Sequence, residues 1–276
     1  MAELARYFSY PFVRYAFAVG VMVALCAALI GVVLVLKRFS FLGDGLSHFA
    51  FGVIAAASVA GLTDNMLVVL PVTVLCAVLL LRAGQNAKIK GDAAVAMISV
   101  SSLAIGYLLL NLFSTSANVS GDVCGTLFGS AGMLTLGRRD MVLCALMTGV
   151  TLMLFILFHN RIFTVSFDES FSTATGTRAS LFNTVTAVMA AVVIVLGMKL
   201  VGSLLITALI VFPALGAMRL FKSFRTVTVF AGVFAVMAAV GGFLLSLVLS
   251  APVGATMAVT DMVLFGICAA VGRMKN

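Results

Sequence analysis

Residues 15–36 read YAFAVGVMVALCAALIGVVLVL, and no charged side chain interrupts them. About 20 residues of α-helix cross the roughly 30 Å hydrocarbon core of a bilayer, so this run alone can span a membrane. The whole chain has the same character: of 276 residues, 63% are hydrophobic and 9% are charged, and the mean hydropathy is +1.25. Soluble domains carry about 25% charged residues. The composition therefore indicates an integral membrane protein.

Further apolar runs of similar length follow along the chain, at residues 46–62, 65–82, 93–113, 141–158, 180–198, 200–220, 226–249 and 254–272. The short alternating segments that are typical of membrane β-barrels are absent from the sequence. None of the connections between the runs is long enough to fold on its own. We therefore predict an all-α polytopic protein with eight or nine transmembrane helices, organised as a single membrane domain over residues 1–276.

The positive charges predict how the chain is oriented. If the N-terminus lies outside, all but five of the 17 Lys and Arg residues fall on the cytoplasmic side, as the positive-inside rule requires. The exceptions are Arg6, Arg14, Arg138, Arg139 and Lys199. His159 then lies at a cytoplasmic span end, at the level of the lipid headgroups. The net charge of +8 reflects a cytoplasmic rim beside the bilayer and requires no nucleic-acid partner. We expect a multi-pass protein of the cell (inner or plasma) membrane.

Two polar residues follow the first apolar run, within residues 39–52, FSFLGDGLSHFAFG. On a helix beginning near Gly43, Asp44 and His48 are four positions apart, which places them on one face with their Cβ atoms about 6 Å apart. A carboxylate in hydrocarbon costs about 2.5–3.5 kcal/mol on insertion scales, so it needs a partner or a cavity. The pair is either a hydrogen bond that orients helices or a cation site.

The chemistry of the pair suits several functions. A carboxylate and a neutral imidazole are both competent ligands for zinc, manganese or iron(II). Two protein ligands hold an ion loosely, which suits a transported ion because it must leave again. The same pair could relay protons in an ion-coupled secondary transporter. An intramembrane enzyme would need a third ligand or a nucleophile, and the sequence offers none. We expect no permanently bound cofactor.

A polar connection at about residues 163–180 contains the sequence FDESFSTATGTRAS at 167–180. Asp168 and Glu169 precede a short helix-compatible stretch, and acidic residues at a helix N-terminus interact favourably with the macrodipole. Capping and docking to a cytoplasmic partner would both explain them. The sequence contains no GxxxxGK[ST] loop and no HExxH or GxSxG motif. If the protein uses ATP, another subunit must therefore bind it, and we expect this chain not to be an enzyme.

Two further features concern helix packing. In residues 119–136, Gly121, Gly125 and Gly129 recur every four positions, which places them on one helical face and allows close backbone approach. This segment is predicted to form a half-helix or re-entrant element, with an external loop helix as the alternative. Pro213 interrupts an apolar run and should kink its helix, either as a hinge or gate or for packing alone.

Four sequence blocks, taken together, resemble a known family. KRFSFLGDGLSHFAFGV resembles the signature after the first span of the permease subunits of metal-ion ABC importers, which handle zinc, manganese or iron(II). CGTLFGS, SFDESFSTATGTRAS and LVGSLLITALIVFPALGAMRL, with LSAPVGAT near the end, fit the same family in the same order. This family more often has Ala at the positions of Gly45 and Phe49, and a Pro-Ala-Ala-Thr-Ala run at 213–217. Neither departure involves a candidate ligand.

The resemblance implies a type II-like ABC-importer permease fold and a homodimer, with a cytoplasmic ABC ATPase dimer that binds ATP and an extracytoplasmic metal-binding protein. Asp44 and His48 match the metal-contacting residues of the family, and Gly43 and Gly45 give the start of their helix its close packing. The 167–180 loop matches the helix that couples the permease to the ATPase, with candidate residues Asp168, Glu169, Ser170, Thr175 and Gly176. The implied mechanism is alternating access, which moves a divalent metal ion into the cytoplasm.

Overall fold

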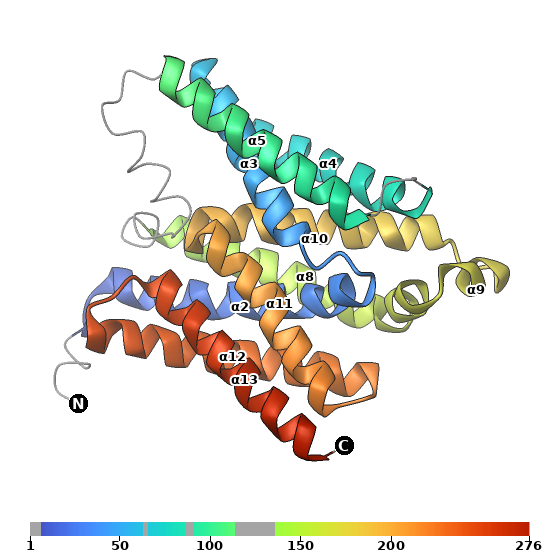
Figure 1. Ribbon diagram of the computed structural model, residues 1–276. Coiled ribbons are helices and arrows are strands. Elements are labelled where there is room, and N and C mark those ends of the chain that lie inside the picture. Colours follow the sequence, from blue (N-terminus) through green and yellow to red (C-terminus); the bar gives the residue numbers. More distant parts are fainter. Residues whose placement is uncertain (1–6, 63–65, 87–90, 114–135, 276) are drawn as a thin grey trace.

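The computed structural model describes residues 7–62, 66–86, 91–113 and 136–275 (Figure 1). The described residues are helical almost throughout, in the elements α2 (Pro11–Leu36), α3 (Leu42–Val59), α4 (Met66–Asn86), α5 (Gly91–Phe113), α8 (Arg138–Phe167), α9 (Glu169–Ala174), α10 (Ala179–Val201), α11 (Ser203–Leu220), α12 (Phe224–Leu249) and α13 (Val253–Lys275). Each predicted apolar run overlaps one of these helices. The glycine-rich segment with Gly121, Gly125 and Gly129 lies outside the described residues, so its predicted half-helix stays a prediction.

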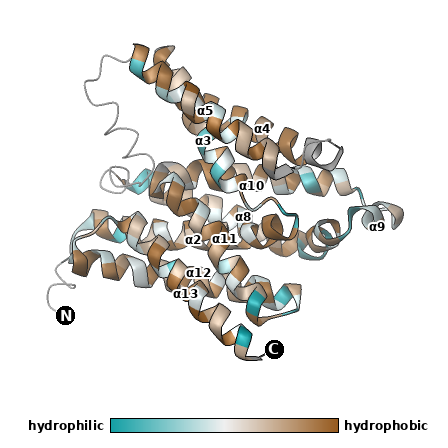
Figure 2. Ribbon diagram, viewed as in Figure 1, coloured by the Kyte–Doolittle hydropathy of each residue, from teal (hydrophilic) through white to brown (hydrophobic). Residues whose placement is uncertain are grey.

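Eight of the described helices are long and apolar enough to cross a membrane, and α4 contributes a shorter apolar stretch, Val68–Leu81. Hydrophobic residues predominate along these helices (Figure 2), as expected of a protein whose outer surface faces lipid. The all-α polytopic class predicted from composition is confirmed. One boundary differs: α8 continues to Phe167, so residues 163–167 belong to this helix and not to the following loop.

Helix α2 forms the centre of the protein. It packs against α8, α10, α11 and α12, and most of its apolar window is buried. The closest approach is at Gly31, where an added Cβ would overlap the backbone carbonyl of Ile210 on α11. Without a strong hydrophobic driving force between helices in lipid, such small-residue contacts supply much of the packing energy. Helix α2 is therefore the scaffold on which the other helices are placed.

Helices α3, α4 and α5 form a second group that packs on the other side of α10 (Figure 1). The most extensive helix pair in the described chain is α3 with α5. These two helices cross at a pair of glycines, since a Cβ added to Gly106 would lie 3.0 Å from the Cα atom of Gly52. This close crossing fixes which residues of α5 reach the polar start of α3.

Two single residues shape the path of α10 and α11. Gly202 alone separates α10 from α11, and its φ of 98° lies in the region that favours glycine. Helix α11 then continues through the buried Pro213, whose ring denies a hydrogen bond to the carbonyl of Leu209. Its proposed role as a hinge or gate stays a prediction.

Candidate metal site and coupling segment

Asp44 and His48 lie on the first two turns of α3 and face each other. The Nε2 atom of His48 is 3.3 Å from the Oδ1 atom of Asp44. The side chain of His48 is 13% exposed and that of Asp44 is 34% exposed, so the carboxylate forms the open side of the pair. The spacing of four residues thus produces the geometry expected on a helix that begins at Leu42.

A third polar residue reaches this pair from another helix. The hydroxyl of Ser99 on α5 donates a hydrogen bond to Oδ2 of Asp44 at 3.4 Å. The contact depends on Gly45, because a Cβ at this position would overlap the side chain of Val95 on α5. Gly43 instead faces α11, where an added Cβ would lie 3.0 Å from Cδ1 of Ile210. Sequence reasoning missed Ser99, since a serine in an apolar run carries no distinguishing signal.

The pair can offer a cation one carboxylate and one imidazole. The Nδ1 atom of His48 is buried and has no hydrogen-bond partner among the described residues. No cluster of three or more His, Cys, Asp or Glu side chains able to hold a metal occurs within the described parts of the chain. A four-coordinate ion such as Zn²⁺ would therefore need ligands from outside these residues. The geometry suits an ion that is held briefly.

The predicted coupling loop contains a short helix, α9, between α8 and α10. Asp168 caps this helix, because its Oδ1 atom accepts a hydrogen bond from the backbone N–H of Phe171 at 2.9 Å. Ser170 is exposed, and the Thr175 hydroxyl donates to the carbonyl of Ser172 at 3.0 Å. Gly176 ends the segment with a φ of 80°. Capping therefore accounts for Asp168.

Glu169 has a different role, because it joins α9 to the helices beside it. Its Oε1 atom accepts a hydrogen bond from the side-chain amide of Asn183 on α10 at 2.9 Å. The oxygen of this amide in turn accepts a hydrogen bond from the ammonium of Lys37, the residue that ends α2. Burial lowers the pKa of Lys37 to about 8, and the negative charge of Glu169 opposes this shift. The sequence did not reveal this network, since its members are far apart along the chain.

A second intramembrane carboxylate, more deeply buried than Asp44, lies on α13. Asp261 is 2% exposed, and its Oδ2 atom has no hydrogen-bond partner among the described residues. A carboxylate in such surroundings is costly unless a partner compensates it. The signal that singled out Asp44, an acidic residue within an apolar run, also applied to Asp261, and sequence reasoning overlooked it.

The sequence is similar to proteins that are named as metal transport membrane proteins. The sequence model described as "ABC 3 transport family" matches residues 9–272. A Thermotoga maritima protein named "Probable metal transport system membrane protein" is 28% identical, over 93% of this chain and 88% of that protein. The "Manganese transport system membrane protein MntC" of Halalkalibacterium halodurans is 24% identical, over 97% and 91%. Other relatives are named as iron and zinc transport membrane proteins.

The fold also has a close counterpart among solved structures. A chain of "PsaBC from Streptococcus pneumoniae in complex with Fab" superposes with a TM-score of 0.82, covering 99% of this chain and all of that one. The sequence identity is 24%, so the likeness establishes the fold alone. The arrangement of helices described above is therefore one that a solved structure also adopts.

Proposed function

The chain belongs to the ABC 3 transport family, and from this premise we propose that it is the permease subunit of an importer for divalent transition-metal ions. The observation that supports this function best is the Asp44–His48 pair, with its 3.3 Å separation and its partly exposed carboxylate. Mixed oxygen and nitrogen ligands accept zinc, manganese and iron(II), the ions in the names of the relatives. The ion is cargo and is not a resident cofactor.

In this proposal Asp44 and His48 contact the ion on its path across the membrane. Ser99 holds one oxygen of Asp44, which leaves the other oxygen directed toward His48. Further coordination comes from water or from a second copy of the chain in a homodimer. An incomplete set of ligands suits transport, because binding must be weak enough to allow release on the far side.

Energy for the cycle comes from a cytoplasmic ABC ATPase dimer, since this sequence contains no phosphate-binding loop. The α9 segment docks on the ATPase, and an extracytoplasmic binding protein delivers the ion from outside. The Asn183 bridge transmits movement of α9 to α2, whose C-terminal end leads into α3 and its polar pair. Alternating access then follows from the movement of these connected helices.

Reconstitution into liposomes tests the function. The chain with its ATPase partner and ATP should accumulate metal ions, whereas the chain alone should not. Asp44→Asn and His48→Ala should each lower uptake at least about tenfold, while membrane insertion and ATPase assembly are retained. Robust gradient-driven uptake by the chain alone would instead support the ion-coupled secondary transporter. Near-normal uptake in both variants would refute the ligand assignment.

A further inference from the structure

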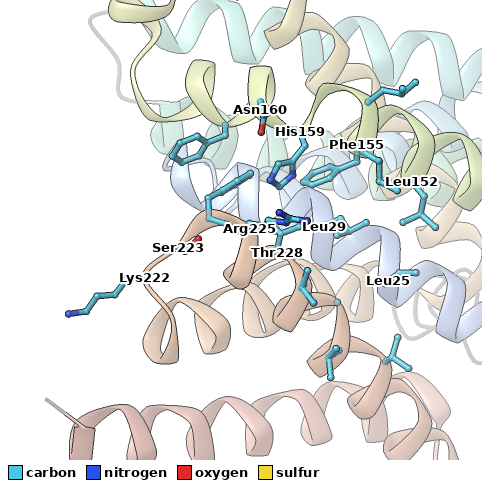
Figure 3. Close-up of a pocket in the computed structure, with 18 of the residues that line it drawn as sticks. Leu25, Leu29, Leu152, Phe155, His159, Asn160, Lys222, Ser223, Arg225 and Thr228 are labelled. Carbon is cyan, nitrogen blue, oxygen red and sulfur yellow. The ribbon is translucent and has the colours of Figure 1, made fainter.

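A groove of about 1100 Å³ opens between α2, α8 and α12 (Figure 3), and none of the residues that line it belongs to α3. Its floor is formed by Leu25 and Leu29 of α2, Phe155 of α8, and Thr228 and Gly232 of α12. This volume slightly exceeds that of ordinary small-molecule sites, which is about 300–1,000 Å³. The groove is therefore large enough to bind a ligand of considerable size.

The lining of the groove changes from apolar to polar along its length. The apolar end includes the exposed side chains of Ile156, Val233 and Met237. The other end is lined by His159 and Asn160 of α8, Lys222 and Ser223 before α12, and Arg225 in the first turn of α12. In Figure 3, Arg225 lies beside His159, whereas the side chain of Lys222 extends away from them. A ligand that fits this lining has a hydrocarbon part and a polar head.

The polar end lies on the side of the protein that carries α9, because α8 runs from His159 directly toward that segment. The charge distribution predicts that this side is cytoplasmic. His159 marks the level at which the apolar part of α8 gives way to polar residues. The polar end of the groove therefore lies at the depth of the headgroups of the cytoplasmic leaflet.

The charge of this end is positive and unbalanced. None of the residues that line the groove is acidic, whereas Lys222 and Arg225 are both basic. Arg225 is exposed and forms no ion pair within the described parts of the chain. Its guanidinium lies beside the imidazole of His159 in Figure 3, and its charge acts on that ring. The groove therefore favours an anion at the polar end.

We propose that this groove binds an anionic phospholipid of the cytoplasmic leaflet. The phosphate lies beside Arg225, with Lys222 as a more distant positive charge, and an acyl chain follows the apolar wall toward Met237. Basic recesses between transmembrane helices on the cytoplasmic side are suited to anionic headgroups. A zwitterionic headgroup would bring a cation toward Arg225, and a soluble phosphate would leave the apolar wall unused. The proposal does not depend on the metal transport function.

The absence of tryptophan from the sequence permits a direct test. Val233→Trp places a single fluorophore in the groove, and Val263→Trp places one on an exposed position of α13 as the matched control. The full-length variants are placed in nanodiscs of phosphatidylcholine that contain increasing amounts of brominated phosphatidylglycerol or brominated phosphatidylcholine. The brominated lipids quench the tryptophan when they are adjacent to it.

Brominated phosphatidylglycerol should quench the Val233→Trp reporter at several-fold lower mole fraction than brominated phosphatidylcholine, while the Val263→Trp reporter should not distinguish them. Adding Arg225→Gln to the Val233→Trp protein should reduce its preference for phosphatidylglycerol about fivefold, which is the contribution of one basic residue near an anionic membrane surface. Adding Arg139→Gln, which removes a positive charge at the opposite end of α8, should leave the lipid preference unchanged.

Three results would overturn the proposal. The first is that the two tryptophan reporters show the same lipid preference. The second is that the preference for phosphatidylglycerol survives Arg225→Gln. The third is that inorganic phosphate displaces the lipid, which would indicate a site for a soluble anion. If the Arg225→Gln protein does not insert, the comparison between the two reporters still decides, since it requires no change of charge.

Discussion

The side-chain amide of Asn183 bridges two helices, because its nitrogen donates to Oε1 of Glu169 at 2.9 Å while its oxygen accepts a hydrogen bond from Lys37. Asn183 is 3% exposed, so water cannot readily replace either partner. The α9 segment is thereby connected to the end of the central helix α2. Each of the three residues can be changed separately, which makes the connection open to experiment.

Asn183→Leu should uncouple ATP hydrolysis from transport. The substitution keeps the approximate size of the side chain, but it removes the amide oxygen that accepts a hydrogen bond from the half-buried Lys37, at a cost of about 1–3 kcal/mol. We expect the ATPase activity of the assembled complex to persist while the number of metal ions moved per ATP falls several-fold. Thr184→Val on the next position of α10 is the control. An unchanged transport ratio in Asn183→Leu would show that the bridge has only a structural role.

Glu169→Lys should weaken assembly with the ATPase. The change reverses the charge at the start of α9 and places a second positive charge near Lys37. Co-purification of the ATPase measures the effect, and Ser170→Lys, which adds a positive charge at an exposed position of α9, tests for a general effect of charge. Normal assembly and coupling in Glu169→Lys would contradict the role proposed for this residue.

Lys37 should make the stability of the protein increase with pH above about 8. The pKa of Lys37 is lowered from 10.5 to about 8 in the folded protein. Between these values the unfolded state binds more protons than the folded state, so the free energy of unfolding rises with pH. Thermal unfolding of the wild type and of Lys37→Met is measured from about pH 7 to about pH 10. The Tm of the wild type should rise with pH relative to the Tm of the variant. A Tm difference that stays constant with pH would contradict the lowered pKa of Lys37.

Ser99→Ala should weaken metal binding without abolishing transport. The hydroxyl donates to Asp44 and does not itself complete the pair, and residues that orient ligands typically contribute about 10–100-fold in affinity. At a contact of 3.4 Å we expect the lower end of this range, seen as a higher KM for metal uptake. Ser101→Ala, at an exposed position of α5, should have no effect. An equal loss in both variants would indicate a general effect on α5.

Gly45→Leu should disrupt the packing of α3 on α5, because a Cβ at this position already meets the side chain of Val95. Uptake and the yield of folded protein should both fall. A second substitution, Val95→Ala, should restore part of the loss by making room. Gly149→Leu on α8, where nothing lies within 4 Å of an added Cβ, is the matched control. If Val95→Ala gives no recovery, the defect arises elsewhere.

The sequence predicted those features that depend on local pattern. Long apolar runs became helices since the bilayer allows few alternatives for a hydrophobic segment. The Asp44–His48 contact was predictable because both residues lie on one helix and its periodicity sets their spacing. Ser99 and Asn183 were not predictable, because each acts on a residue of another helix and one sequence does not reveal which helix faces align. Asp261 could have been found, and the rule that identified Asp44 was not applied to it.

The glycine crossing of α3 and α5 has a mechanical consequence. Gly52 and Gly106 carry no side chains, so the two backbones approach closely there, with Phe51 and Ser102 packed beside them. A side chain at either position would push α3 and α5 apart. The distance across which Ser99 reaches Asp44 therefore depends on two residues that have no side chain of their own.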